Sequence, residues 1–382
     1  MSQLDPERQR KAREYARASR RLWLANTVVS AVYALAWLLL GWGTSLRAWL
    51  VEIWPLLSNP WLLVPVFAGF FAGLLAVITL PLSYYGGYVL PHRYGQSTQT
   101  LKGWIGDQLK GLLVGAPLGL VLVELLYLAL RAAGDLWWLW TAAGLLVFNV
   151  LLSNLAPVLI MPLFNKYVPL GEEHEELAQR LLRLAGKART RVRGVYKFDM
   201  SRRTTAANAA LTGIGSTRRI ILGDTLVNEF TEDEIETVLA HELGHHVHRD
   251  VLIYILGGAL MTMLGLYAAS AAMKWAVAWF GFESVSDPAA LPALALVMGA
   301  YGLLTMPLEN AVSRWREAMA DQYALNVTGK GEAFASAFVR LANQNLGEVE
   351  PERWVVWLFH SHPPLGERIA AARAWEEEAA QP

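Results

Sequence analysis

The chain lacks cysteine entirely, since none occurs among its 382 residues. It can therefore form no disulfide, and no thiolate is available as a metal ligand or as a nucleophile. Any metal ion that it binds must be held by histidine, aspartate or glutamate side chains. The chain also lacks an excess of either charge, because its formal net charge is +0. This balance gives no reason to expect a nucleic acid partner, and we expect none.

Charged residues are scarce, whereas long apolar runs are abundant. Asp, Glu, Lys and Arg make up 17% of the chain and hydrophobic residues 54%, while soluble domains carry about 25% charged residues. A helix needs about 20 mainly apolar residues to cross the hydrocarbon core of a bilayer. Six stretches meet this requirement, which predicts a polytopic membrane protein with spans at 22–42, 61–84, 111–130, 137–160, 251–280 and 289–309.

Tryptophan is frequent, with 16 copies, and several of them lie at the ends of the apolar runs. Such positions are typical of the aromatic belt at a membrane–water interface. The short run Trp49–Leu57 contains a charged residue and is too brief to span, so we expect it to lie in the interface. The tryptophans at run ends are Trp54, Trp61, Trp137, Trp138, Trp140 and Trp275.

The distribution of Lys and Arg predicts how the spans are oriented, because these residues gather in short cytoplasmic loops. They are concentrated before the first span, between spans two and three, and between spans four and five. The loops on the opposite side hold only Arg47, Arg131 and Lys274. We therefore expect a multi-pass protein of the cell inner (plasma) membrane, with both termini and the active site on the cytoplasmic side.

The segment between spans four and five is polar and is predicted to form a small α+β domain. Residues 172–188 show the apolar spacing of an amphipathic helix. Three strands are predicted to follow, at Val192–Met200, 205–215 and 218–227. The expected organisation of the whole chain is four spans in 1–160, this catalytic domain in 161–250, spans five and six in 251–310, and a helical part in 311–382.

A helix with chemically informative residues is predicted after Thr231, because Thr231 and Glu234 have the spacing of a capping box. The helix carries His241-Glu242-Leu243-Gly244-His245, an HExxH pattern. Residues four apart lie on one face of a helix, so both imidazoles can reach one metal ion. Glu242 lies about 100° further round and can deprotonate a water that the metal polarises. The alternative is a polar helix face with this spacing by chance.

A catalytic zinc ion takes three protein ligands and keeps one position open for water. The third ligand must come from elsewhere, and the segment 313–325 offers Glu317 and Asp321, one helical turn apart. We expect Glu317 to bind the metal. Asp321 can accept a hydrogen bond from the outer nitrogen of a ligand histidine and so fix its tautomer. An ordinary solvated pair of carboxylates is the alternative.

Two further segments are candidates for substrate contacts. Asn208 and Ala209 lie in a predicted strand, and an exposed edge strand can bind a peptide as an additional strand. His362 and Arg368 flank a double proline and could donate hydrogen bonds to the oxyanion of a tetrahedral intermediate. The alternatives are a plain sheet strand and a plain turn before a helix.

Three other polar residues are interpreted without a catalytic role. His246 and His248 lie beside the HExxH pattern but off its ligand face, so we expect them at the surface or at an interface. Glu124 lies inside the third predicted span, where an ionisable group faces protein or water. Either a helix–helix hydrogen bond or a water-lined cavity would accommodate it.

In combination, these residues resemble one known family, the type I CAAX prenyl proteases, in a compact bacterial form. Those proteins are membrane zinc metallopeptidases. The resemblance spans Leu90 to Ile369 and rests on six stretches that occur in the same order: "LPHRYGQSTQTLKGWIGDQLK", "LAPVLIMPLFNKYVPL", "SRRTTAANAALTGIGSTRRIILGDTL", "VLAHELGHHVHRD", "SRWREAMADQYAL" and "SHPPLGERI".

The resemblance implies a fold and a set of roles. The fold would be mainly α, with about six transmembrane helices enclosing a chamber, plus a small α+β gluzincin-like catalytic domain. One Zn²⁺ per chain would be bound, and the implied roles are zinc ligands at His241, His245 and Glu317, a base at Glu242, support of a ligand histidine by Asp321, substrate binding by Asn208 and Ala209, and places near the catalytic centre for His362 and Arg368.

Two features depart from this family. Its eukaryotic members usually have a seventh span, and the predicted strand reads "NAALTGIG" where members commonly carry aromatic residues after Asn-Ala. Substrate preference is therefore open between prenylated CAAX-type peptides and other hydrophobic peptides or membrane proteins. The oligomeric state is also open, a monomer included.

The predicted function is that of a zinc metalloendopeptidase working on peptide or protein substrates in contact with the lipid bilayer. One alternative within the same enzyme class is a heat-shock type membrane metalloprotease with a quality-control role. An alternative from another class is a membrane transport or structural protein that contains a structural metal. The last would need a closed site with four ligands and would have no use for Glu242.

Overall fold

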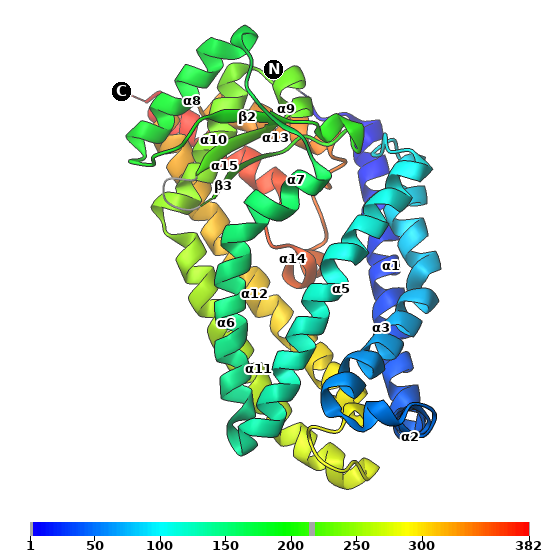
Figure 1. The fold of residues 1–382 in the computed structure, drawn as a ribbon. Coiled ribbons are helices and arrows are strands. Elements are labelled where there is room, and N and C mark those ends of the chain that lie inside the picture. The colour runs from blue at the N-terminus through cyan, green and yellow to red at the C-terminus, as the bar shows by residue number, and fades with distance from the viewer. Residues whose placement is uncertain (1–2, 214–217, 382) are drawn as a thin grey trace.

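The structure is a computed structural model that describes residues 3–213 and 218–381. Long helices form the lower part of the molecule, and a compact part with a small sheet and shorter helices lies at one end of them (Figure 1). Both chain ends lie at this same end. That arrangement agrees with an even number of spans and with a polar domain on the side of the termini.

Six helices among the described residues are long and apolar enough to cross a membrane, which confirms the predicted number of spans. The first helix ends at Leu39, before the predicted limit at 42, whereas each of the other five contains its predicted stretch and continues into polar residues at one or both ends. Two of the six widen into a π-helical turn next to a proline, which lacks the N–H that a regular turn needs. The main helical segments are α1 (Pro6–Leu39), α3 (Pro60–Tyr84), α5 (Leu101–Ala132), α6 (Trp137–Leu155), α11 (Asp250–Phe280) and α12 (Leu291–Thr328).

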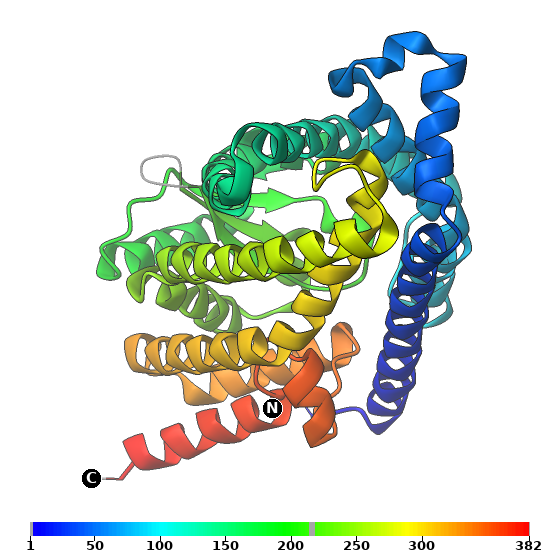
Figure 2. The same ribbon diagram turned by 90° about the horizontal axis from the view of Figure 1, so that it is seen from below.

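These six helices pack as a closed ring. Each contacts its neighbour in the order α1, α3, α5, α6, α11, α12, and α12 returns to α1, as the view from below shows (Figure 2). Large apolar side chains remain exposed along the helices, for example Leu113 at 75% and Leu304 at 81%. An apolar surface of this extent is characteristic of contact with lipid.

The short helix α2 (Trp42–Ile53) lies at the end of the ring far from the sheet and forms an ion pair with the segment just before α12. Helix α2 carries exposed tryptophans such as Trp49 and is too short to span. Its Arg47 lies 2.6 Å from the buried carboxylate of Asp287, just before α12. The predicted interfacial run at Trp49–Leu57 thus includes the end of a short helix that ties two parts of the ring together.

Glu124 in α5 contacts its own helix, so the expected hydrogen bond to a neighbouring helix is absent among the described residues. Its carboxylate lies 3.6 Å from Arg131, which belongs to the same helix. The Arg131 guanidinium in turn lies 4.5 Å from the ring centre of Trp61 in α3. The pair is therefore within one helix, and the contact between helices is made by the arginine and an aromatic ring.

The sheet contains four strands, β1 (Tyr167–Pro169), β2 (Val195–Phe198), β3 (Ala209–Thr212) and β4 (Arg219–Gly223). Their order is β1-β2-β4-β3, so β3 lies at an edge. It pairs antiparallel with β4, whereas β2 and β4 are parallel.

Three details of the predicted strands were wrong or incomplete. The stretch 218–227 is a strand only to Gly223, because Asp224–Glu229 forms helix α9. The strand predicted at Val192–Met200 is the shorter β2, and β1 was missed because three residues carry too little pattern. The separator predicted at Gly215-Ser216-Thr217 lies outside the described residues.

The remaining helices cover the sheet and share one hydrophobic core with it, and α12 enters that core from the membrane ring. The capping box predicted at Thr231 and Glu234 is present, with both of its hydrogen bonds. These helices are α8 (Glu175–Lys187), α10 (Glu232–Val247), α13 (Gly331–Gln344) and α15 (Leu365–Ala379), whereas the short helix α14 (Arg353–Phe359) contributes no residue to this core. The segments 161–250 and 311–382 therefore fold around one core.

Candidate metal centre

The candidate site forms where α10 and α12 cross at very short distance. Gly244 of the HExxH pattern faces Ala320 of α12, and a Cβ added to the glycine would lie only 2.9 Å from the Ala320 Cα. Such a crossing is possible only without a side chain at position 244. Because Glu317 and Asp321 flank Ala320 on α12, the crossing carries both carboxylates to the two histidines.

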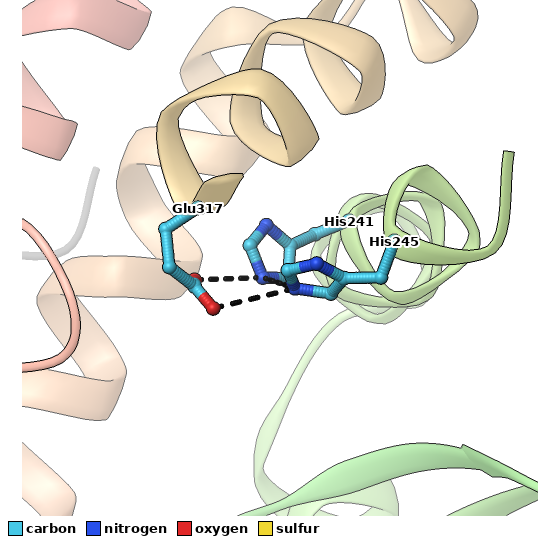
Figure 3. A group of neighbouring side chains, drawn as sticks. All are labelled: His241, His245 and Glu317. Carbon is cyan, nitrogen blue, oxygen red and sulfur yellow. Dashed lines mark hydrogen bonds and ion pairs between the residues drawn. The ribbon is translucent and has the colours of Figure 1, made fainter. Parts of the chain in front are cut away.

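Three predicted ligands meet at this crossing, as Figure 3 shows. The Nε2 atoms of His241 and His245 lie 3.2 Å apart. The Glu317 carboxylate lies 3.2 Å from His241 Nε2 through one oxygen and 3.4 Å from His245 Nε2 through the other. All the candidate ligand atoms lie within 4.8 Å of one another, so a single ion can contact all three residues.

Each ligand histidine has a carboxylate behind it. His241 Nδ1 lies 2.8 Å from Asp321, as predicted, and His245 Nδ1 lies 2.7 Å from Asp250, which the sequence analysis missed. A carboxylate can only accept, so both Nδ1 atoms donate. In the neutral ring, each Nε2 atom therefore carries a lone pair, and this lone pair faces Glu317.

The chemistry of this donor set fits a cation. One buried oxygen of Glu317 has no hydrogen-bond partner among the described residues. Burial alone would lower the pKa of His241, but hydrogen bonds to Asp321 and Glu317 outweigh it and raise the pKa to about 9. Contacts with Glu317 and Asp250 likewise raise the pKa of His245 against the effect of burial. The site thus favours positive charge, and two imidazoles with one carboxylate suit zinc.

Each of the two supporting carboxylates is itself held by a buried arginine. Arg316 Nε donates to Asp250 at 2.6 Å, and Arg368 Nε donates to Asp321 at 2.8 Å. The Arg368 guanidinium also lies 4.0 Å from the ring centre of Phe338, so packing fixes its plane. These two arginine–carboxylate pairs neutralise charge around the ligands and hold the outer carboxylates in place.

The predicted base, Glu242, is placed differently from the ligands. Among the described residues its carboxylate has no hydrogen-bond or ion-pair partner. Burial raises the pKa of Glu242, while the nearby His241 and His245 oppose the rise. A carboxylate that is unpaired, partly buried and next to the ligands is available to take up a proton.

One cavity of about 410 Å³ brings most of the predicted site together. His362 lies at its rim, with Nε2 3.3 Å from Glu317 and Nδ1 2.9 Å from the Ser361 hydroxyl. Burial lowers the pKa of His362, which favours the neutral ring. The predicted residues that line the cavity are Asn208, Ala209, His241, Glu242, His362 and Arg368.

The two neighbouring histidines stay outside the cluster. His246 and His248 are half-buried and belong to no group of metal-ligating side chains among the described residues. The ring of His248 contacts Tyr323 at 6.0 Å, and its carbonyl accepts a hydrogen bond from Arg316. Neither residue is therefore a candidate ligand of this metal centre.

Comparison with known proteins identifies the family. Residues 172–376 match the family model of Peptidase family M48, and residues 1–166 match that of the CAAX prenyl protease N-terminal region, which is described as five membrane helices. The chain belongs to peptidase family M48. It is thus a membrane metalloendopeptidase, and among the described residues of its N-terminal region the helices α1, α3, α5 and α6 are long and apolar enough to span.

Two relatives and one solved structure show how far the M48 likeness extends. The chain is 35% identical over 304 residues to an uncharacterized metalloprotease, YhfN, of Bacillus subtilis, covering 78% of this chain and 71% of the relative. It is 32% identical over 327 residues to CAAX prenyl protease 1 of Saccharomyces cerevisiae, covering 80% and 71%. The crystal structure of S. mikatae Ste24p matches with a TM-score of 0.87 at 26% identity, covering 97% of this chain and 90% of that one. The predicted fold class is therefore confirmed.

The close helix crossing can be tested with Gly244→Ala. The added methyl group would collide with the Ala320 backbone, force α10 and α12 apart, and cost about 1–3 kcal/mol in stability. We expect purified Gly244→Ala to hold much less than one zinc per chain by elemental mass spectrometry and to melt at a lower temperature. Gly186→Ala is the matched control, because a Cβ there meets no atom within 4 Å. Full zinc content in Gly244→Ala would contradict this role of the crossing.

The support of His245 by Asp250 can be tested with Asp250→Asn. Loss of the negative charge behind the ligand ring should weaken zinc binding about 10- to 100-fold, measured by competition with a chelator of known affinity. The control Asp233→Asn, at the start of α10, the helix that carries His245, should bind zinc like the wild type. Equal zinc affinity in Asp250→Asn and the wild type would show that Asp250 has no part in the metal site.

Proposed function

We propose that this M48 protein is a zinc endopeptidase that cleaves peptides with hydrophobic or prenylated segments at the membrane. The observation that carries the proposal is the unpaired Glu242 carboxylate beside the His241, His245 and Glu317 cluster, in a cavity that an edge strand also lines. A closed structural site is disfavoured, because the described residues offer three clustered ligands and not four.

His241, His245 and Glu317 would hold the zinc ion. When bound, zinc polarises a substrate carbonyl and lowers the pKa of a water molecule. Glu242 takes the proton of the attacking water and passes it to the leaving amine. Burial raises its pKa above the usual value of a carboxyl group, which makes Glu242 a better proton acceptor for this exchange.

His362 and Arg368 are proposed to stabilise the oxyanion that forms during attack. The neutral His362 ring can present an N–H toward the cavity. The Arg368 guanidinium is committed to Asp321 through Nε and one terminal nitrogen, whereas its other terminal nitrogen has no partner among the described residues. Arg368 therefore combines support of His241 with a remaining donor.

Strand β3 is proposed to bind the substrate main chain. It lies at the sheet edge, and Asn208 and Ala209 line the cavity together with the candidate ligand His241. A peptide that adds to this edge as a further strand would present its amide bonds along the cavity. The exposed Asn208 side chain can provide an additional hydrogen bond next to the reacting amide.

The preference for hydrophobic or prenylated substrates rests on the position of the site and on the named relatives. Helix α14 lies below the sheet, on the side of the membrane helices (Figure 1), and exposes Trp354 and Trp357. It leads directly to His362 at the cavity. Relatives bear the name CAAX prenyl protease 1, and the distribution of Lys and Arg supports a cytoplasmic location for this end of the ring.

The mechanism predicts that Glu242→Gln abolishes cleavage while zinc remains bound. A mixed peptide pool, half of it farnesylated, would be incubated with detergent-purified proteins, and the products identified by mass spectrometry. Wild type and the control His246→Gln should cleave, preferentially near the C-terminus of farnesylated peptides. Cleavage of unmodified hydrophobic peptides alone would assign a general peptidase activity. Normal cleavage by Glu242→Gln would refute the assignment of the base.

A further inference from the structure

The edge of strand β3 offers its backbone groups at alternate residues only. Gly223 N–H donates to the Asn208 carbonyl at 2.9 Å, so the backbone N–H and C=O groups of Asn208 point toward β4. Residues on an antiparallel strand alternate between the two sides. Ala207, Ala209 and Leu211 therefore direct their N–H and C=O groups away from the sheet, toward the edge at which a substrate would add.

Before β3, this outward edge is already occupied by the chain itself. Thr98 N–H donates to the Arg203 carbonyl at 3.1 Å, and Thr205 N–H donates to the Gln96 carbonyl at 3.3 Å. The Thr205 carbonyl also accepts a hydrogen bond from the Gln344 side chain at 2.8 Å. A peptide cannot pair with the edge at Arg203 or Thr205.

The side chain of Asn345 occupies the next outward position. Ala207 N–H donates to its Oδ1 at 2.8 Å, and its Nδ2 donates to the Ala207 carbonyl at 3.1 Å. One carboxamide thus makes the same two bonds that a residue of a neighbouring strand would make. Ala209 and Leu211, the next two outward positions, have no such partner among the described residues, so the free edge begins at Ala209.

Asn345 is held firmly in this position by the end of helix α13. Its N–H donates to the Leu341 carbonyl at 2.9 Å, and Gly347 N–H donates to the Ala342 carbonyl at 2.9 Å. Leu346 between them is buried and has a φ of 49°, a backbone conformation that residues other than glycine rarely adopt. Surrounding structure must impose such a backbone, so the carboxamide is fixed.

We infer that Asn345 is a specificity-determining residue that ends the substrate-binding edge. The inference rests on the proposed addition of the substrate to β3. Asn345 and His241 line the same cavity, so the point at which the free edge ends lies at a fixed distance from the metal centre. It limits how many substrate residues on one side of the cleaved bond can pair with the enzyme, and a longer segment must leave the edge there.

The size of the effect follows from the geometry of the edge. Loss of the carboxamide frees Ala207 alone, because Thr205 keeps its own partners. Since alternate residues face the edge, one additional pairing position accommodates two more substrate residues, or about 7 Å of extended chain. Two hydrogen bonds of about 1 kcal/mol each amount to at least tenfold in kcat/KM for a peptide that can use them.

The test uses two series of hydrophobic peptides that are lengthened one residue at a time on either side of a fixed cleavage site. In the wild type, kcat/KM should stop rising at a definite length on one side. In Asn345→Ala this limit should move out by two residues. Asn345→Asp keeps an acceptor for Ala207 N–H and fills the same space, so its limit should stay in place.

Asn343→Ala is the matched control, because Asn343 lies in the last turn of α13, just before Asn345, but its side chain accepts a hydrogen bond from Asp5 N–H and donates one to the Gln3 carbonyl. It should show the wild-type limit. An unchanged limit in Asn345→Ala would overturn the inference while leaving the peptidase function intact. If Asn345→Ala loses its zinc or its thermal transition, Asn345→Ser provides the same test. Absence of cleavage by the wild type would instead refute the proposed function.

Discussion

The crossing of α10 and α12 at Gly244 and Ala320 is the constraint on which the site depends. The HExxH helix can supply two imidazoles but no third ligand on the same face. The missing carboxylate comes from a helix whose next turn also supplies Asp321. Both contacts require backbones close enough that even one methyl group between them would collide. The glycine within the pattern is therefore structural, and it determines where Glu317 lies.

The same helix connects the membrane ring to the chemistry. Helix α12 begins at the far end of the ring, beside the Arg47–Asp287 pair, and runs without interruption to the core of the catalytic part. The third candidate ligand is thus on an element whose lower half packs against α11 and α1. Because one helix carries both the candidate ligand and the contacts with the membrane helices, the site keeps a fixed position relative to them. This explains why an M48 site adjoins a bilayer.

Local patterns in the sequence predicted the parts of the site that lie within single helices. The spacing of His241 and His245 and that of Glu317 and Asp321 each place two side chains on one helix face. Asp250 was missed because the chain reverses at Arg249, which has a φ of 56°, and no sequence signal marks a left-handed arginine. Asn345 was missed because its partner, Ala207, lies far away in the chain. Leu226 and Val227 were assigned to a strand because short apolar runs fit strand and helix alike.

The most direct test of this account is X-ray absorption at the zinc edge of the purified, detergent-solubilised protein. The account predicts one zinc per chain, with nitrogen and oxygen ligands at about 2.0–2.1 Å, two of them imidazoles, and one ligand that exchanges with solvent. A protein that remains metal-free in zinc-containing buffer, or a zinc ion closed by four protein ligands, would contradict it.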